Sequence, residues 1–587
     1  MAKRGKRTAS AANRGQRTAS AAKRGRGQSR RPRQRKPTHD PVTLEILWTR
    51  LITVANEQAA ALMRTSFTPI VRESGDLSAS LFDPQGRMLA QAVTGTPGHI
   101  NSLATGMKHF IATYPPETLK PGDVLITNDP WLTSGQLNDL SIVTPAFRDD
   151  KLVGFFGNTC HALDIGGLGL SADATDVYQE GLWIPITKLE TAGEPNKQLF
   201  DLIAANVRAP TEVLGDIQAQ IAANQVGADS LLRYLQEFDL DDLSELGEEI
   251  LTRSEQAMRD SIAAIPDGRY TKTIHTDGLD EPVTIACAVE VQGDEIVIDF
   301  EGSSPQANRG INVVLNYTHA YASYALKCAI SPEIPHNDGS FQPVSVTAPE
   351  GSILNPRQPA AVAARHIIGH FLPHAVLGAL VDVVPDRVVA EGAGNIWLTT
   401  VRGAGDDRFV TVFFASGGMG ARPDKDGLSA TSFPSGIATT PVEVVESTSP
   451  LVIRRKELRR DSGGPGRYRG GLGQRIEVEV NTGEPYVVSV LSDRFRFAAE
   501  GYEGGEPGAK AKFTASDGEK RDPKLSQALP AGTSFTLDLP GGGGFHDPSK
   551  RDPDAIAEDV AEDLVSPRAA KAKYGWKPKT KAKEKRK

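Results

Sequence analysis

The sequence has few cysteines and no long apolar run, and both absences narrow the class of protein. Only three cysteines occur among 587 residues, at Cys160, Cys287 and Cys328. Such a small, odd number argues against a disulfide-built secreted protein and favours a reducing compartment, the cytoplasm. No apolar run reaches the roughly 18 residues that a membrane helix needs. The basic N-terminus also lacks the apolar stretch of a secretory signal.

Several signatures of nucleotide binding and hydrolysis are also missing. The glycines at 541–545 are not followed by the Lys-Ser/Thr of a phosphate-binding loop, and no GxGxxG motif opens a strand–helix unit. No GxSxG or HExxH motif is present, so the signatures of serine hydrolases and zincins are absent. We interpret the glycine-rich stretches at 461–473 and 541–545 as tight turns. The alternative is an anion site formed by backbone amides with Arg467 and Arg469.

Charge is distributed unevenly along the chain. Residues 1–37 hold 14 Lys/Arg and no acid, and the rest holds 52 basic and 73 acidic residues, a net charge of −21. Residues 571–587 carry nine Lys/Arg and one Glu. An acidic body makes nucleic acid an unlikely partner. The tails at 1–38 and 577–587 are expected to be disordered because they have little apolar surface to bury.

The hydrophobic pattern predicts an α+β protein with several mixed or antiparallel sheets and flanking helices. Periodic apolar residues predict helices over 41–64, 213–238 and 243–264, and a buried helix over 360–382. Alternating residues predict hairpins at 80–91 and 284–302 and two paired strands at 141–147 and 151–157. From about 440 onward the pattern predicts short strands separated by Gly and Pro. No regular βαβ alternation supports a doubly wound sheet.

Changes in this texture predict three ordered regions. Residues 39–268 form an N-terminal α+β domain, 269–480 a central α+β domain, and 481–576 a β-rich C-terminal region. The boundary at 268 follows Ile-Pro-Asp-Gly, which is a stop-and-turn signal.

The densest group of polar residues lies at 128–166, around the strands at 141–147 and 151–157. It contains Asp129, Gln136, Asp139, His161 and Asp164. Because the strands form a hairpin, Asp139 and His161 are expected to lie near each other at its open end. Carboxylate and imidazole are ligands suited to Zn²⁺, Mn²⁺ or Fe²⁺. The alternative is a set of loop residues hydrogen-bonded to nearby turns.

Two further polar sites precede this group. In the stretch 64–83, Glu73 and Asp76 stand among small hydroxyl residues, and Asp76 comes just before a predicted strand. It could act as a general base or a metal ligand, or only shape a turn. His99 titrates in the range used in catalysis, although a lone histidine is more often structural.

The order of several motifs resembles the hydantoinase B family, which includes one of the two chains of N-methylhydantoinase, half of 5-oxoprolinase and a large subunit of acetone carboxylase. The matching pieces are RTSFTPIVRESGDLSASLFDPQGRMLAQ, PGHINSL, PGDVLITNDPW, QLNDLSIVTPAF, HALDIGG, VYQEGLWIP, GSILNPRQPAAV, DSGGPGRYRGGLG and PGGGGFHDPSKRDP, followed by KYG. They run in family order from about residue 40 to 576. The resemblance thus covers nearly the whole chain except its tails.

This resemblance implies a hydrolase subunit that works with an ATP-binding partner, a hydantoinase A-type chain. The partner phosphorylates the carbonyl oxygen of a cyclic amide, such as a hydantoin, 5-oxoproline or a lactam. The B-type chain then adds water and opens the ring at a metal site. An unstrained lactam is a poor electrophile, so activation by phosphorylation is chemically reasonable. ATP is accordingly expected on the partner, in a cytoplasmic hetero-oligomer.

The family pattern also implies a metal-ligand set of His, Asp and His. Here Asp139 and His161 match, but Gln136 stands where the first histidine is expected. A weak or exchangeable Mn²⁺ or Zn²⁺ site follows, because a neutral amide is a weaker ligand than imidazole. Asp76 matches the acidic position that serves as a candidate base. Asp129 and Asp164 could complete the shell, and His99 and Glu73 are additional candidates.

Two other functions remain open from the sequence. One is a carboxylase subunit of the acetone or acetophenone type, in which the activated species attacks a carboxyl phosphate. The other is a non-catalytic partner that has lost its metal site at Gln136.

Overall fold

The computed structural model describes residues 38–403 and 409–577. The segments predicted as disordered tails fall almost entirely outside these described residues. From His39 onward the chain forms one compact unit. The predicted boundaries at 268 and 480 fall inside this unit, at the beginning of β8 (Gly268–Thr276) and the end of β15 (Gln474–Val480).

The N-terminal half is built on a seven-stranded sheet of order β2-β1-β5-β4-β3-β6-β7. All its paired neighbours are antiparallel. The strands are β1 (Leu77–Phe82), β2 (Met88–Gln91), β3 (Val124–Thr127), β4 (Asp139–Arg148), β5 (Lys151–His161), β6 (Thr187–Thr191) and β7 (Glu194–Pro195). The predicted hairpin at 80–91 is confirmed, and its turn is closed by a hydrogen bond from Gly86 N to Asp83 O (2.9 Å).

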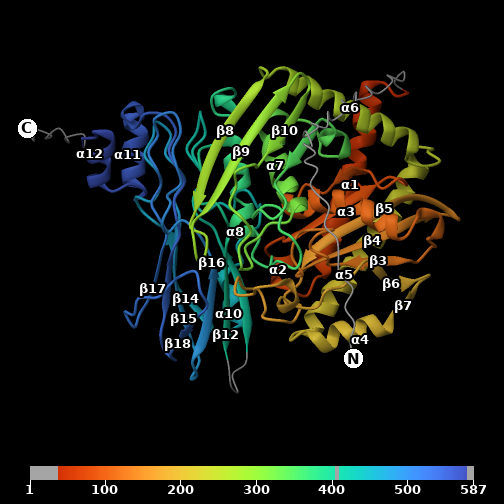
Figure 1. Cartoon of the computed structure of the whole chain (residues 1–587), viewed down its shortest axis with the longest axis horizontal. Coiled ribbons are helices and arrows are strands. Elements are labelled where there is room, and N and C mark those ends of the chain that lie inside the picture. The colour runs from red at the N-terminus through yellow and green to blue at the C-terminus, as the bar shows by residue number, and fades with distance from the viewer. Residues whose placement is uncertain (1–37, 404–408, 578–587) are drawn as a thin grey trace, which may run out of the picture. The chain divides into compact units, whose positions relative to one another are not determined.

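Helices cover both faces of this sheet (Figure 1). The helices are α1 (Pro41–Thr65), α2 (Pro69–Arg72), α3 (Pro97–Thr113), α4 (Lys197–Asn206), α5 (Pro210–Glu237) and α6 (Ser244–Ala263). Adjacent strand residues point to opposite faces, so Leu81 and Phe156 pack with α1 and α5. Phe82 and Phe155 instead pack with α3. The predicted helices at 41–64, 213–238 and 243–264 are therefore confirmed.

Three four-stranded sheets follow, ordered β11-β10-β9-β8, β13-β12-β16-β18 and β14-β15-β19-β17. The first contains β8, β9 (Val283–Gln292), β10 (Glu295–Asp299) and β11 (Val344–Thr347). The other two contain β15 together with β12 (Trp397–Gly403), β13 (Val410–Ala415), β14 (Leu451–Leu458), β16 (Tyr486–Leu491), β17 (Lys512–Ala515), β18 (Gln527–Leu529) and β19 (Phe535–Asp538). One parallel pair, β10 with β11, makes the first of these sheets mixed. The α+β prediction is confirmed.

The remaining helices lie among these sheets. They are α7 (Leu315–Ile330), α8 (His366–Gly369), α9 (Leu372–Ala379), α10 (Val442–Thr448), α11 (Pro553–Ala561) and α12 (Pro567–Tyr574). The prediction of one buried helix over 360–382 is wrong in part, because the segment is buried but forms two short helices. Pro373 has no backbone N–H to donate, and the helix restarts at Leu372, which fits proline in the first turn of a helix.

The glycine-rich segments do not form the predicted tight turns. Gly542 donates to Gly471 O (3.0 Å), Gly543 to Glu391 O (2.8 Å) and Gly544 to Glu506 O (3.0 Å). Successive residues thus bond to three different backbone segments, as in a bundle of extended chains. A Cβ on Gly542 would lie 2.1 Å from Met419 O, so the backbones pack where side chains would normally stand. We call this packing of 417–420, 462–473, 500–508 and 541–544 the glycine bundle.

No helix among the described residues is both long and apolar enough to span a lipid bilayer.

Candidate functional site

The ends of three adjacent strands bring the predicted polar residues together. Asp139 is the first residue of β4 and pairs in register with His161, the last residue of β5. The His161 N–H donates to the carbonyl of Asp76, just before β1 (3.3 Å). The two strands are longer than predicted, so Asp139 and His161 belong to the ladder itself. Their expected proximity is confirmed.

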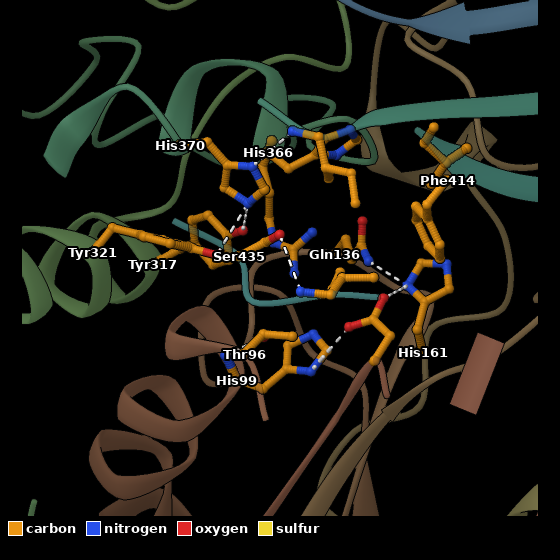
Figure 2. A pocket seen from close by; sticks show the side chains of 15 residues that line it. Thr96, His99, Gln136, His161, Tyr317, Tyr321, His366, His370, Phe414 and Ser435 are labelled. Carbon is orange, nitrogen blue, oxygen red and sulfur yellow. Dashed lines mark hydrogen bonds and ion pairs between the residues drawn. The ribbon is translucent and has the colours of Figure 1, made fainter. Parts of the chain in front are cut away.

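Asp139 is the centre of the group. Its Oδ1 accepts from Gln136 Nε2 (2.7 Å) and lies 3.1 Å from His161 Nδ1. Its Oδ2 lies 3.1 Å from His99 Nε2 and accepts from the Arg365 guanidinium. Figure 2 shows Gln136 and His161 facing each other, and their Nε2 and Nδ1 atoms are 2.8 Å apart. Asp139 is fully buried, so these partners take the place of water.

Charges of opposite sign balance one another in this group. Burial alone would raise the pKa of Asp139, but the charges of Arg365 and His99 outweigh it and hold that pKa well below its usual range. Burial would lower the pKa of His99, yet Asp139 and Asp76 outweigh it and raise that pKa above its ordinary value. His99 also lies 3.6 Å from Asp76 through its Nδ1 atom. His99 therefore bridges the two carboxylates.

A small cavity of about 30 Å³ adjoins this group, enough for about one water molecule. Its charged and polar lining includes Asp76, His99, Gln136, His161 and Arg365. We call it the catalytic cavity. Helix α3 begins beside it, since the Thr96 side chain both lines the cavity and accepts from the N–H of His99.

A wall of aromatic rings and histidines closes the other side of the catalytic cavity (Figure 2). The Tyr321 hydroxyl lies 3.0 Å from His370 Nε2, and the Ile396 N–H donates to His370 Nδ1 (3.4 Å). The hydrogen of the neutral ring is therefore on Nε2. Burial lowers the pKa of His366 to about 3, so this ring is also uncharged. Arg365 lies 4.2 Å above the Tyr317 ring, a cation–π contact that orients the guanidinium.

Three of the additional candidates do not belong to the site. Asp164 accepts from the backbone N–H and guanidinium of Arg208. Asp129 accepts from the N–H of Trp131 (2.9 Å), and Glu73 accepts from Arg72 (2.8 Å). None of these three carboxylates lines the catalytic cavity. The expectation that Asp129 or Asp164 completes a metal shell is wrong, because each is already engaged in a local structural bond.

The sequence reasoning missed Arg365, His366 and His370. They lie in the apolar stretch predicted as one buried helix, and Arg365 is 226 residues from its partner Asp139. Their spacing carried a usable signal, since three histidines at 366, 370 and 374 recur at helical intervals inside an apolar segment. Glu180 was also missed. It lies within the VYQEGLWIP motif and accepts from the backbone N–H groups of Val362 and Ala363 (2.6 and 2.7 Å).

The donor set can be compared with the requirements of a metal ion. Gln136, Asp139 and His161 approach one another to 2.7–3.1 Å, as the ligands of one ion do. The buried Gln136 Oε1 and His161 Nε2 atoms have no hydrogen-bond partner among the described residues. The described residues hold no cluster of three His, Cys, Asp or Glu with ligand geometry, so the amide of Gln136 must be the third ligand. The residues fit a divalent ion in type and convergence, with Arg365 as a competing cation at Asp139.

The chain was also compared with known proteins. Residues 40–548 match the family model for hydantoinase B/oxoprolinase. A chain of the putative D-/L-hydantoinase of Pseudomonas sp. (strain NS671), its B-type chain, is 32% identical, over 91% of this chain and 95% of that protein. The beta chain of the caprolactamase of Pseudomonas jessenii is 31% identical, over 92% of this chain and 96% of that protein. The crystal structure of the ATP-dependent caprolactamase from the same species superposes with a TM-score of 0.81 at 28% identity, covering 92% and 96% of the two chains. The chain therefore belongs to the hydantoinase B/oxoprolinase family.

Proposed function

We propose that this chain is the B-type component of an ATP-dependent hydrolase that opens cyclic amides. The observation that carries the proposal is the buried group of Asp76, His99, Asp139 and His161 beside a water-sized cavity. Such a group can hold and deprotonate a water molecule away from bulk solvent. One relative is named as the beta chain of a caprolactamase, and a solved relative is described as ATP-dependent.

ATP is assigned to an A-type partner chain in this proposal. The chain carries no phosphate-binding loop or dinucleotide motif. The partner would transfer a phosphoryl group to the carbonyl oxygen of the amide. The three cysteines form no disulfide, which fits a complex in the reducing cytoplasm.

Gln136, Asp139 and His161 would hold a divalent ion, Mn²⁺ or Zn²⁺. When bound, such an ion supplies Lewis acidity that polarises a carbonyl or acidifies water. Asp76 accepts the proton of the attacking water, and His99 orients Asp76 from 3.6 Å. The water oxygen bonds to the carbonyl carbon, the ring C–N bond breaks, and the nitrogen leaves with a proton. Arg365 supplies a fixed positive charge beside the phosphoryl group that the activated ring carries.

The test is purification of this chain with the neighbouring A-type protein, followed by an ATPase and product screen. Hydantoins, 5-oxoproline and lactams are the substrates, and labelled bicarbonate is included in a parallel series. Ring-opened product formed with ATP consumption supports the proposal. Incorporation of the label would replace it with the carboxylase function, and absence of turnover with every substrate would count against a catalytic role.

A further inference from the structure

A second cavity, of about 290 Å³, lies next to the catalytic cavity and is roughly ten times larger. It is lined by residues of three regions: the strand end at Gln91, the beginning of α3, and the segment 431–436. Val93 also lines it and is 82% exposed, so the cavity reaches the protein surface there. We call it the outer cavity.

The two cavities share one thin partition. Along 434–437, Pro434 and Gly436 line the outer cavity, whereas Ser435 and Ile437 line the catalytic cavity. Thr96 likewise lines the catalytic cavity, while its neighbours on both sides line the outer one. A Cβ placed on Gly436 would lie 3.5 Å from the carbonyl oxygen of Gly95. At this contact only backbone stands between the outer cavity and the catalytic residues.

Aromatic contacts join the two cavities as well. Tyr321 lines the catalytic cavity and Tyr324 lines the outer one, and their rings meet edge to face at 6.5 Å. Both project from α7. The position of a ring in the outer cavity is therefore coupled to the wall of the catalytic cavity.

The size of the cavities decides where a substrate ring can lie. The catalytic cavity has room for about one water molecule. A five- to seven-membered ring does not fit there, but the outer cavity can take one. The water and the catalytic side chains then occupy one side of the partition, and the ring occupies the other.

The outer cavity is uncharged. None of its 14 lining residues, all within the described part of the chain, is Asp, Glu, Lys or Arg. The titratable His336 stays neutral, because burial, aided by the charge of Lys327, lowers its pKa to about 3. A ligand that carried a carboxylate would bury its charge without a counter-charge, which is strongly unfavourable.

Two buried polar side-chain atoms at this cavity lack a hydrogen-bond partner among the described residues. They are the amide oxygen of Gln91, which is an acceptor, and His336 Nε2. Buried polar atoms are normally paired, so two orphans in one cavity indicate a ligand. An acceptor and an imidazole N–H together complement the N–H and C=O of an amide. A ketone has no N–H to offer Gln91.

We propose that the outer cavity binds the ring of an uncharged cyclic amide, a lactam or hydantoin, through Gln91 and His336. This inference rests on the proposed function and narrows it. It predicts that neutral rings are preferred to 5-oxoproline, whose carboxylate is ionised at neutral pH. The ring enters past Val93 and presents its carbonyl toward Gly95 and Gly436.

Binding is tested on the full-length chain by calorimetry, with caprolactam as the neutral probe and 5-oxoproline as the anionic one. We expect caprolactam to bind at least tenfold more tightly. Gln91→Leu and His336→Phe should each weaken caprolactam binding by about tenfold, because each removes one hydrogen bond inside the cavity. Gln225→Leu and His109→Phe make the same chemical changes at exposed positions and should leave the affinity unaltered.

The outcomes separate this inference from the proposed function. Equal binding of 5-oxoproline, or wild-type affinity in both cavity variants, would overturn the inference, as would a complex that hydrolyses caprolactam without either variant affecting KM. If caprolactam binds as expected but no complex with the partner hydrolyses any amide, the proposed function fails while the binding site stands. Asp139→Asn should retain caprolactam binding and lose turnover.

Discussion

Asp139 shows how much a single residue depends on its partners. It is fully buried and faces two imidazoles, one amide and one guanidinium. Removing its charge would leave Arg365 buried without a counter-ion, which typically costs about 3–5 kcal/mol. A variant at Asp139 therefore reports on folding as well as on chemistry. His161 is the better position for a test of the metal site.

We predict that His161→Ala abolishes retention of Mn²⁺ or Zn²⁺ and turnover, while the protein still folds. Gln136→His should tighten metal binding, because imidazole is a stronger ligand than an amide oxygen. Metal content by mass spectrometry and circular dichroism check both variants. His109→Ala, at an exposed position, is the control. Full metal content and activity in His161→Ala would show that the group does not bind the metal.

A second prediction at this scale concerns Glu180. Burial raises its pKa to about 8, against an ordinary value of 4.5. Between these values the folded protein keeps a proton that the unfolded chain releases, so the free energy of unfolding falls as pH rises. The loss is complete above about pH 8. Each pKa unit corresponds to about 1.4 kcal/mol.

Glu180→Gln should remove this part of the pH dependence, since the amide keeps an acceptor for Val362 and Ala363 and does not ionise. Urea denaturation at pH 5, 6.5 and 8 measures the effect. The variant should gain stability relative to wild type as pH increases. Glu45→Gln, on an exposed part of α1, should follow wild type at every pH. Parallel curves for wild type and Glu180→Gln would contradict the raised pKa.

At the scale of elements, regular periodicity was readable and close backbone packing was not. The amphipathic helix α1 and the hairpin of β4 and β5 follow from the spacing of apolar residues. That hairpin also placed Asp139 beside His161. The break between α8 and α9 escaped prediction, because apolar residues occur on all sides of a fully buried segment. Arg365 could not be assigned to the site, since no local pattern reports a partner 226 residues away.

The glycine bundle gives a prediction for an element rather than a site. A Cβ on Gly542 would lie within 2.1–2.7 Å of backbone atoms of Met419 and Gly420, which cannot move as a side chain can. We predict that Gly542→Ala costs about 3 kcal/mol of stability or more. Gly483→Ala is the matched control, because no atom lies within 4 Å of its added Cβ. Thermal unfolding of the two variants compares them, and equal melting temperatures would refute the close packing.

At the scale of the whole molecule, the proposed reaction needs two proteins. We predict that the chain forms a stable complex with an A-type chain, because it lacks a nucleotide motif of its own. Co-expression followed by size-exclusion chromatography with light scattering, at micromolar concentration, measures the complex. Separate elution of the two proteins would contradict this prediction. The Asp139→Asn variant should still assemble, since that residue is buried away from any surface.

Deletion of 1–37 and 578–587 is a second prediction at this scale. These segments carry many like charges and little apolar surface, and the compact unit begins at His39. We expect the melting temperature to change by less than about 2 °C, since surface changes usually cost under about 0.5 kcal/mol. A deletion from 566 onward should lower it clearly, because α12 packs on α11 and Lys573 pairs with Glu506. A loss of several degrees in the first deletion would show that the tails dock on the body.

The glycine bundle has a consequence at the level of the gene. Every codon for glycine begins with GG, and any single-base change there that alters the amino acid introduces a side chain or a stop. At Gly418, Gly470 and Gly542 the first added carbon would lie within about 2.1 Å of another backbone. No conservative replacement exists for such a position. A saturation mutagenesis map of this protein should therefore outline the bundle as a block where every substitution is rejected, while the exposed loops between its segments accept most changes.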